Sequence, residues 1–388
     1  EEPVWNVQYD MVESESIGLL KLDMLGLSTL DVCYTALRLI RKRHGKKIDL
    51  YHVPFEKEVF QEIYVKGATD GVFQCESAGM KRMWMDLKPS CIEDIIAGIA
   101  LYRPGPMEFI PDYIRGKENP QSIHYKTEKL RPILESTYGC IVFQEQVMRI
   151  VRDLAGYSMG RSDLVRRAMS KKKEDVMAQE RKNFVYGNEK EGIPGCVQNG
   201  ISAGVADSIY DDMVDFAKYA FNKSHAAAYA LVSYQTAWLK YHYPLEFMVG
   251  AMDVAARQNA PDKLPGLLHE CRRMGIEVLP PDVNLSKEGF SILDGKLLYG
   301  LWAVKGVKEK APEVIANRHP IYRSFKEFLL SCKANKTAIR NLVKAGAFTQ
   351  LHASRTGILL SLEELLAMRG KIWKLKEKVD GCQAALDG

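Results

Sequence analysis

The sequence predicts a mostly α-helical fold of the α+β type, with little β-structure. Three observations predict it. Apolar residues recur at helical spacing from about residue 56 to about residue 250, and glycines and prolines divide this stretch into separate helices. Residues 18–27 alternate with period two, which indicates a strand. An Asp-Gly pair at 294–295 lies between two short apolar runs, the pattern of a β-hairpin.

Length and composition are those of a globular protein with two or three domains. The chain has 388 residues, of which 46% are hydrophobic and 27% are charged. No apolar run is long enough to cross a bilayer and no signal-peptide pattern is present, so we expect no membrane partner. None of the eight cysteines forms Cys-x-x-Cys, which indicates neither a zinc site nor a disulfide framework and favours a reducing cytoplasm. The first residue is not Met, and we expect a piece of a longer protein.

The predicted strand at 18–27 carries charges on an otherwise apolar pattern. Leu20, Leu22 and Met24 share one face, and Lys21 and Asp23 share the other. Burying a charge is costly unless it is paired, bound to metal or functional. The spacing alone leaves two interpretations open, a salt-bridged surface strand and a functional carboxylate.

Capping residues and prolines then predict the helix boundaries. Ser28, with Asp31 three residues later, indicates the N-cap of a helix that Gly45 ends. The Pro-Gly-Pro sequence at 104–106 predicts a rigid turn.

A long helix is expected after Asn222. Its side chain can cap the first turn, and Pro244 terminates the helix. His225 and Tyr229 are i and i+4 neighbours, so they lie on one face of it.

The C-terminal part predicts a hairpin followed by paired helical units. Residues 290–293 and 296–299 flank a type I′ turn at Asp294-Gly295. An apolar-Gly turn at 304–307 precedes a helical stretch to Arg318.

A second helix at 336–343 ends in a tight break at 344–348. Two such units indicate tandem helix-hairpin-helix modules, whose turns present backbone N–H groups to phosphate. Two ordinary helical hairpins are the alternative. Residues 368–378 form a basic, amphipathic tail.

Basic residues concentrate at one place, although the net charge of +5 is too small to establish a polyanionic partner. The stretch 161–173 carries a single acid, Asp163. Its bases are Arg161, Arg166, Arg167, Lys171, Lys172 and Lys173. The cluster suits phosphate groups, and a solvated helix face is the alternative.

Assembled in chain order, several strings resemble the catalytic alpha subunits of bacterial DNA polymerase III, the C-family replicative polymerases. The resemblance covers about residues 5–365. Its strings are Lys21–Leu27 (KLDMLGL), Gly71–Ser77 (GVFQCES), Tyr102–Pro106 (YRPGP), Phe143–Met148 (FQEQVM), Leu164–Lys173 (LVRRAMSKKK) and Phe221–Thr236 (FNKSHAAAYALVSYQT).

The resemblance implies a catalytic role for Asp23. The family binds two Mg²⁺ ions through three palm aspartates, and Asp23 matches the third of these metal ligands. Two such ions activate the primer 3′-OH and neutralise the leaving pyrophosphate. No Asp-x-Asp pair, which would supply the other two, occurs in this sequence. We therefore expect the chain alone to be inactive.

The resemblance also implies a domain organisation and partners. We expect the end of the palm at 1–55, the fingers at 56–278, the little finger with tandem helix-hairpin-helix units at 279–365, and at 366–388 a tail leading to the clamp-binding region. The expected partners are primer-template DNA, dNTP, the sliding clamp and other replisome subunits. Gln383–Asp387 lies roughly where the family carries its clamp peptide, but Asp387 replaces the aromatic anchor.

Site residues carry over by position. The residues that match the family's nucleotide site are Lys21, Arg166, Arg167, Lys171, Asn222, Ser224 and His225. The expected DNA contacts are Arg103, Lys305, Gly306 and Lys308, although Lys308 stands where the family has a second glycine. A non-catalytic nucleic-acid-binding module of the same fold, or a structural interaction protein, remains an alternative function.

Overall fold

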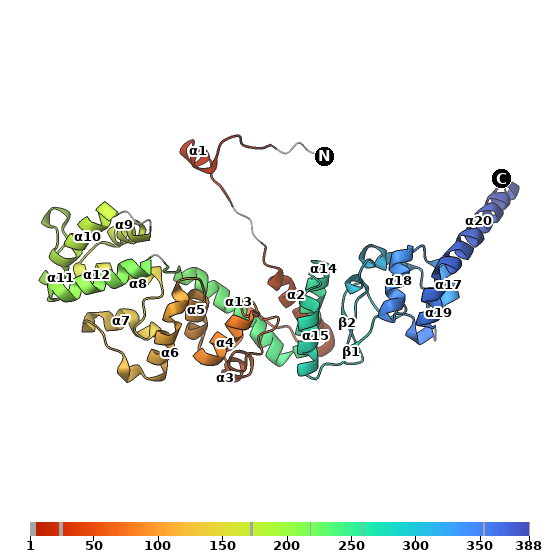
Figure 1. Cartoon of the computed structure of the whole chain (residues 1–388), viewed down its shortest axis with the longest axis horizontal. Helices are drawn as coiled ribbons and strands as arrows, with labels where there is room; N and C mark the ends of the chain where they lie inside the picture. Colours follow the sequence, from red (N-terminus) through yellow and green to blue (C-terminus); the bar gives the residue numbers. More distant parts are fainter. Residues whose placement is uncertain are drawn as a thin grey trace.

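The computed structural model describes residues 5–22, 26–170, 174–217, 219–258, 260–351 and 354–387. Side chains are also left undescribed at 170, 174, 217 and 379–387. The described chain is an elongated series of helical groups with one small sheet (Figure 1). The mostly helical α+β prediction is confirmed.

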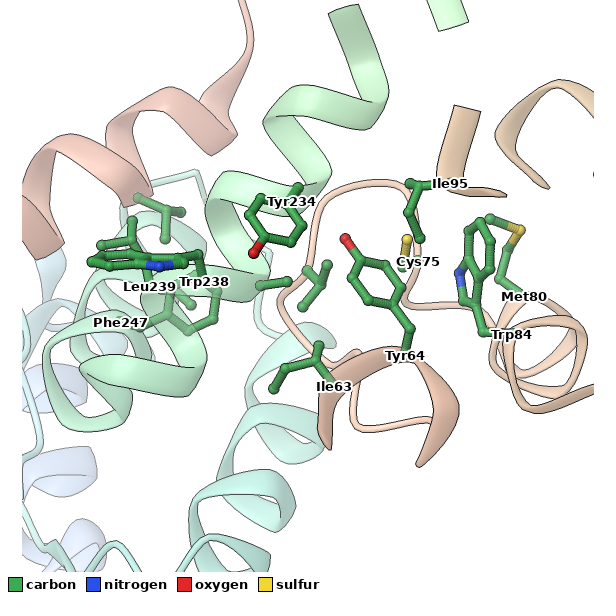
Figure 2. Close-up of a cluster of buried hydrophobic side chains, with 14 of the residues drawn as sticks. Ile63, Tyr64, Cys75, Met80, Trp84, Ile95, Tyr234, Trp238, Leu239 and Phe247 are labelled. Atoms are coloured by element: carbon green, nitrogen blue, oxygen red, sulfur yellow. The ribbon is translucent and has the colours of Figure 1, made fainter. Parts of the chain in front are cut away.

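The first core lies in the middle of the molecule. It buries residues of α2 (Ser28–His44), α3 (Lys57–Val59), α4 (Ala78–Leu87), α5 (Ile92–Leu101), α13 (Lys223–His242), α14 (Pro244–Arg257) and α15 (Lys263–Arg273). Gly250 lets α14 approach α2 closely, since a Cβ there would lie 2.9 Å from the Val32 carbonyl oxygen. Figure 2 shows Tyr64, Trp84 and Tyr234 filling the space between these helices.

The second core lies at the end of the molecule where α9–α12 gather in Figure 1. Its helices are α7 (Arg131–Leu134), α8 (Gln144–Ala155), α9 (Met159–Ser170), α10 (Glu174–Tyr186), α11 (Gly195–Gln198) and α12 (Ala203–Ala217). Helix α6 (Ile110–Glu118) leads into it from α5. The stretch 56–278 therefore contains two hydrophobic cores.

The third core is formed mainly by residues that follow the small sheet in the chain. Strand β3 (Lys296–Leu298) lies between β1 (Val278–Leu279), which is parallel to it, and β2 (Ser291–Leu293), which is antiparallel. Asp294 and Gly295 both have positive φ, as the predicted type I′ turn requires. The helices that follow are α16 (Ala311–Ala316), α17 (Phe325–Ser331), α18 (Lys336–Ala345), α19 (Arg355–Leu360) and α20 (Leu362–Asp387).

The helical prediction for the paired units is confirmed in outline. The turn at 305–307 leads through a 3₁₀ helix, Lys308–Lys310, into α16, which ends before Arg318. Helix α18 ends at Ala345, and its C-cap Gly346 adopts φ +85°. The basic tail continues as α20, in which the side chains of Gln383–Asp387 lie outside the described residues.

The prediction of a strand at 18–27 is wrong for the part that the structure describes. Residues 18–22 and 26–27 form no bridge with any described residue. Leu20 and Leu22 are 82% and 73% exposed. An isolated strand is not stable in water, because its exposed N–H and C=O groups bond to water equally well in other conformations. The segment instead forms an arm with one short helix, α1 (Met11–Ser16), which the sequence patterns did not indicate.

The first helix boundary also differs by one residue. Ser28 is the first helical residue of α2. The N-cap is Leu27, whose side chain makes no capping hydrogen bond. Ser28 therefore does not act as the predicted N-cap. The predicted end at Gly45 is confirmed, with φ +67° and an N–H bonded to the Arg41 carbonyl.

Candidate nucleotide and nucleic-acid site

The start of α13 is held by two side chains. Asn222 caps it as predicted, because its Oδ1 accepts a hydrogen bond from the His225 N–H at 2.9 Å. Both carboxylate oxygens of Glu145 accept from the Lys223 N–H, at 3.1 and 3.0 Å. A negative charge at a helix N-terminus is stabilising. A nucleotide at this end would therefore use side chains such as Ser224 and His225, both exposed, rather than these N–H groups.

Aromatic rings continue from this end along α13. The His225 and Tyr229 ring centroids are 4.2 Å apart, which confirms the predicted neighbours. His225 also meets Phe221 edge-on at 5.3 Å. On the other side, Tyr229 lies 5.1 Å from the ring of Phe73. Two segments distant in sequence, 221–229 and the loop with Phe73, thus form one row of rings, which offers a face on which a planar group can pack.

Arg103 belongs to the same end of α13. Its Nη2 donates to the Tyr219 carbonyl at 2.8 Å, and its guanidinium lies 4.0 Å from the centroid of the Phe221 ring. The predicted turn at 104–106 is present, and Gly105 adopts φ +100° against the Tyr219 ring. Burial lowers the pKa of Arg103. Much of the Arg103 fork is therefore used to hold the backbone that leads into α13.

A bridge between distant segments completes this arrangement. Phe143 pairs in parallel with Phe221, and the Gln144 N–H donates to the Phe221 carbonyl at 3.0 Å. Glu145 follows directly, which explains how it reaches α13. The sequence did not indicate the contact between Glu145 and Lys223, because the partners lie 78 residues apart and no short-range pattern marks such a contact.

Two arginines of the basic cluster, Arg166 and Arg167, are paired within their own helix, α9. Arg166 Nη2 and Arg167 Nε each lie 2.8 Å from a different oxygen of Asp163. The hydrogen bond from Arg166, with the charges of both arginines, lowers the pKa of Asp163. Arg167 remains 62% exposed, and Arg161 pairs with Glu180 of α10 and with the exposed Glu191. Lys171 lies outside the described residues.

A cavity of about 430 Å³ lies between the start of α2 and α14–α15. The loop that contains Phe73 and Gln74 forms another of its walls. Ser28 and Thr29 line it, directly after the run that contains Asp23. Lys21 is exposed in the arm, with its Nζ 3.9 Å from the Met11 sulfur, and Asp23 itself lies outside the described residues.

The turn at 305–307 is anchored on α18. The Lys305 carbonyl accepts from Asn341 Nδ2 at 2.6 Å, and Gly306 adopts φ +72°. Lys308 Nζ donates to the Arg257 carbonyl at 2.5 Å, so this ammonium is engaged by the end of α14. Lys305 and Gly306 are exposed, and Lys305 is the better placed of the two lysines to meet a phosphate.

The described residues contain neither a cluster of metal-ligating side chains nor a membrane-spanning helix. No group of three or more His, Cys, Asp or Glu side chains there could hold a metal ion. The described residues therefore do not fit a two-ion site, and the metal role of Asp23 stays a prediction. None of the helices in the described part of the chain is long and apolar enough to span a membrane.

Comparison with known proteins gives consistent matches along the chain. A family model described as the bacterial DNA polymerase III alpha subunit finger domain matches residues 29–192, and one described as a helix-hairpin-helix motif matches residues 275–358. DNA polymerase III subunit alpha of Thermus aquaticus is 44% identical over 370 residues, which are 92% of this chain and 29% of that protein. The Pasteurella multocida and Escherichia coli K12 proteins of the same name are 42% and 41% identical, again over 92% of the chain. The chain spans about a third of the length of these curated relatives.

Proposed function

Since the chain belongs to the family of bacterial DNA polymerase III alpha subunits, we propose that it binds the incoming dNTP and primer-template DNA for template-directed DNA synthesis. The observation that carries this proposal is the arrangement of side chains at the N-terminal end of α13. At this end lie Asn222, Ser224 and His225 of one segment and Arg103 of another, which is far away in sequence and is brought there by the tertiary fold.

The side chains suggest a division of roles in the nucleotide site. His225 and Tyr229 present ring faces to the base or sugar. Arg166 and Arg167 bind the triphosphate, because their planar forks match phosphate oxygens better than they match one shared carboxylate. Lys171 and Lys21 extend this positive charge. We keep Asp23 as the proposed ligand of a divalent ion, Mg²⁺ in the full-length enzyme.

DNA binding is assigned to the C-terminal units and to the turn at Arg103. Lys305 and Gly306 present an exposed turn of a helix-hairpin-helix motif, which holds the phosphate backbone without reading bases. Lys308 contributes less, because the Arg257 carbonyl already accepts from its Nζ. Other proposed partners are the sliding clamp and further replisome subunits, in a bacterial cytoplasm.

Two binding measurements test the proposal. Equilibrium dialysis with a labelled dNTP is expected to show saturable binding that Arg166→Ala with Arg167→Ala weakens strongly, while affinity for primed DNA changes little. Lys182→Ala, an exposed basic residue of α10, is the matched control. Unchanged dNTP affinity in the double variant would overturn the assignment. For DNA, Lys305→Ala should reduce the slope of log K against log salt by about 1.

A primer-extension assay separates the two candidate functions. We expect this chain alone to extend no primer, since it carries no Asp-x-Asp pair. Extension by the purified chain would refute that argument. Binding of DNA together with failure to bind any dNTP would favour the alternative, a non-catalytic nucleic-acid-binding module of the same fold.

A further inference from the structure

The loop at 68–77 is attached to one face of α13. Thr236 Oγ1 accepts a hydrogen bond from the Phe73 N–H at 3.1 Å. Cys75 Sγ lies 3.3 Å from Ser233 Oγ, and Figure 2 shows Cys75 enclosed between Tyr64 and Trp84. Lys240 forms the third attachment. The spacing 233, 236 and 240 puts all three residues on the same side of the helix.

Lys240 is the unusual member of this set. Its side chain is 0% exposed, and its Nζ donates to the Ala68 and Asp70 carbonyls, each at 2.7 Å. The third contact is Glu270 Oε1, 2.6 Å away and itself 1% exposed. An ammonium has three N–H donors, so each has an acceptor here. Arg273 pairs with the same carboxylate from the solvent side, with Nε 2.7 Å from Oε2.

Burying this lysine is expensive, and the charges explain how it is tolerated. Burial lowers the pKa of Lys240, while the charge of Glu270 opposes the change. Burial alone would raise the pKa of Glu270. Hydrogen bonds and charge from Arg273 and Lys240 outweigh this and lower its pKa to about 2. A well-packed apolar pair at such a site is often as stable as an ion pair. Stability alone therefore does not explain the ion pair. The hydrogen bonds from Lys240 to the Ala68 and Asp70 carbonyls indicate that it fixes the loop at 68–77.

The loop leads directly to the proposed nucleotide site. Phe73 supplies the last ring of the row formed with Tyr229 and His225. Gln74 is exposed and adopts φ +61°, a left-handed backbone that few residues other than glycine adopt. Gly71, next to the carbonyl that Lys240 binds, lines the cavity beside α2 together with Phe73 and Gln74. Displacement of Asp70 would therefore move a wall of that cavity.

We propose that Lys240, held by Glu270, is a positioning residue of the nucleotide site: it fixes the loop at 68–77 so that Phe73 supports the His225–Tyr229 rings and Gln74 faces the cavity. This inference rests on the proposed function, because it assumes that the His225 end of α13 binds dNTP. Lys240 itself contacts no part of the nucleotide in this arrangement.

The molecule contains a matched control for this proposal. Lys117 Nζ also donates to two carbonyls, those of Leu87 and Lys88 at 3.1 and 2.7 Å, and to a buried carboxylate, Asp94, at 2.6 Å. That lysine holds the end of α4 and has no contact with the loop at 68–77. Lys240→Met and Lys117→Met therefore remove the same type of interaction, and only the first reaches the proposed site.

The experiment measures labelled-dNTP affinity and primed-DNA affinity of each variant, below the unfolding temperatures of all of them. We expect Lys240→Met to weaken dNTP binding by about tenfold, as misalignment of a pocket wall does, and to leave DNA affinity unchanged. Lys117→Met should leave both affinities unchanged while lowering the unfolding temperature. Equal dNTP affinity in the two lysine variants would overturn the positioning role.

Two further outcomes keep the test decisive. Should Lys240→Met fail to fold, Thr236→Val removes the acceptor of the Phe73 N–H, together with the hydroxyl's hydrogen bond to the Ser233 carbonyl inside α13. It is expected to weaken dNTP binding in the same direction, and unchanged binding in that variant rejects the proposal. Failure of the unaltered chain to bind dNTP contradicts the proposed function itself, and the inference with it, and this result is distinct from binding that Lys240→Met leaves intact.

Discussion

The start of α13 and the basic face of α9 order their side chains in different ways. At α13, Arg103, Glu145 and Phe73 come from three distant segments and fix the capped helix end. On α9, the ion pairs of Arg166 and Arg167 within the described part of the chain are with Asp163 of the same helix. The first arrangement is built by the tertiary fold and is preorganised. The second is local, and its Arg167 is mostly exposed, so an incoming phosphate can replace the carboxylate at this guanidinium at low cost.

Removing Arg103 should have the largest effect. Arg103→Ala loses the stacking on Phe221 and the hydrogen bond to the Tyr219 carbonyl, which together predict a loss of about 2 kcal/mol in unfolding free energy. Arg131 is the local counterpart, because it lies 4.8 Å from the Tyr125 ring centroid and pairs with Glu128 three residues away.

Chemical denaturation of the two variants makes the comparison. Arg131→Ala should cost much less, because exposed ion pairs contribute little to stability. Arg103→Lys keeps the charge without the planar fork and is expected to restore little of the loss. Equal losses of unfolding free energy in Arg103→Ala and Arg131→Ala would show that an arginine with partners distant in sequence stabilises the fold no more than one paired three residues away.

The cap at Asn222 comes next in size. Asn222→Ala should reduce the unfolding free energy by about 1 kcal/mol, because the His225 N–H loses its acceptor. Asn335 caps α18 in the same way, accepting from the Ala338 N–H at 2.8 Å. Its Ala variant should lose similar stability, yet only the Asn222 variant should weaken dNTP binding. Parallel melting curves and dNTP titrations distinguish them, and Asn222→Ser is expected to retain most of both properties.

The sequence predicted the features that depend on neighbouring residues. Asn222 and Pro244 predicted the bounds of α13, because a cap and a terminating proline act within one turn of a helix. Asp294-Gly295 predicted the turn of the β-hairpin, because turn type depends on these two residues. Residues 18–27 alternate like a strand, yet the described part is an arm, since pairing depends on a partner that periodicity does not supply.

Residues buried by the tertiary fold could not be predicted in this way. Lys240 is one of several basic residues on a helix, and nothing adjacent in sequence shows that Ala68 and Glu270 enclose it. Arg103 was expected to bind DNA, but much of its fork serves the backbone at Tyr219. For Lys240 and Arg103 the deciding contact lies more than one hundred residues away along the chain.

Asp163 allows the local arrangement to be changed without loss of the helix. Asp163→Asn removes the charge that Arg166 and Arg167 share, so we expect dNTP affinity to rise several-fold at low salt. Asp153 is the matched control, since it too pairs with two arginines, Arg149 and Arg152. Asp153→Asn changes the net charge equally and should leave dNTP affinity unchanged. A rise in both variants would assign the effect to overall charge.

The pH dependence of the same pair should be the smallest effect. The arginines lower the pKa of Asp163 in the folded chain, so the folded state favours the ionised carboxylate. That contribution is complete above the ordinary aspartate pKa of about 4 and is lost as pH falls through the lower, folded value. Because Arg167 is mostly exposed, the gain is about 0.5 kcal/mol at most.

Denaturation of the unaltered chain and of Asp163→Asn between neutral pH and pH 3 isolates this contribution. The difference in stability between the two should shrink as the pH falls and should also shrink in high salt, since exposed charges are screened. A difference that stays constant with pH would mean that Asp163 stabilises α9 through its hydrogen bonds rather than its charge. In that case the Arg167 guanidinium would be less available to phosphate than its exposure indicates.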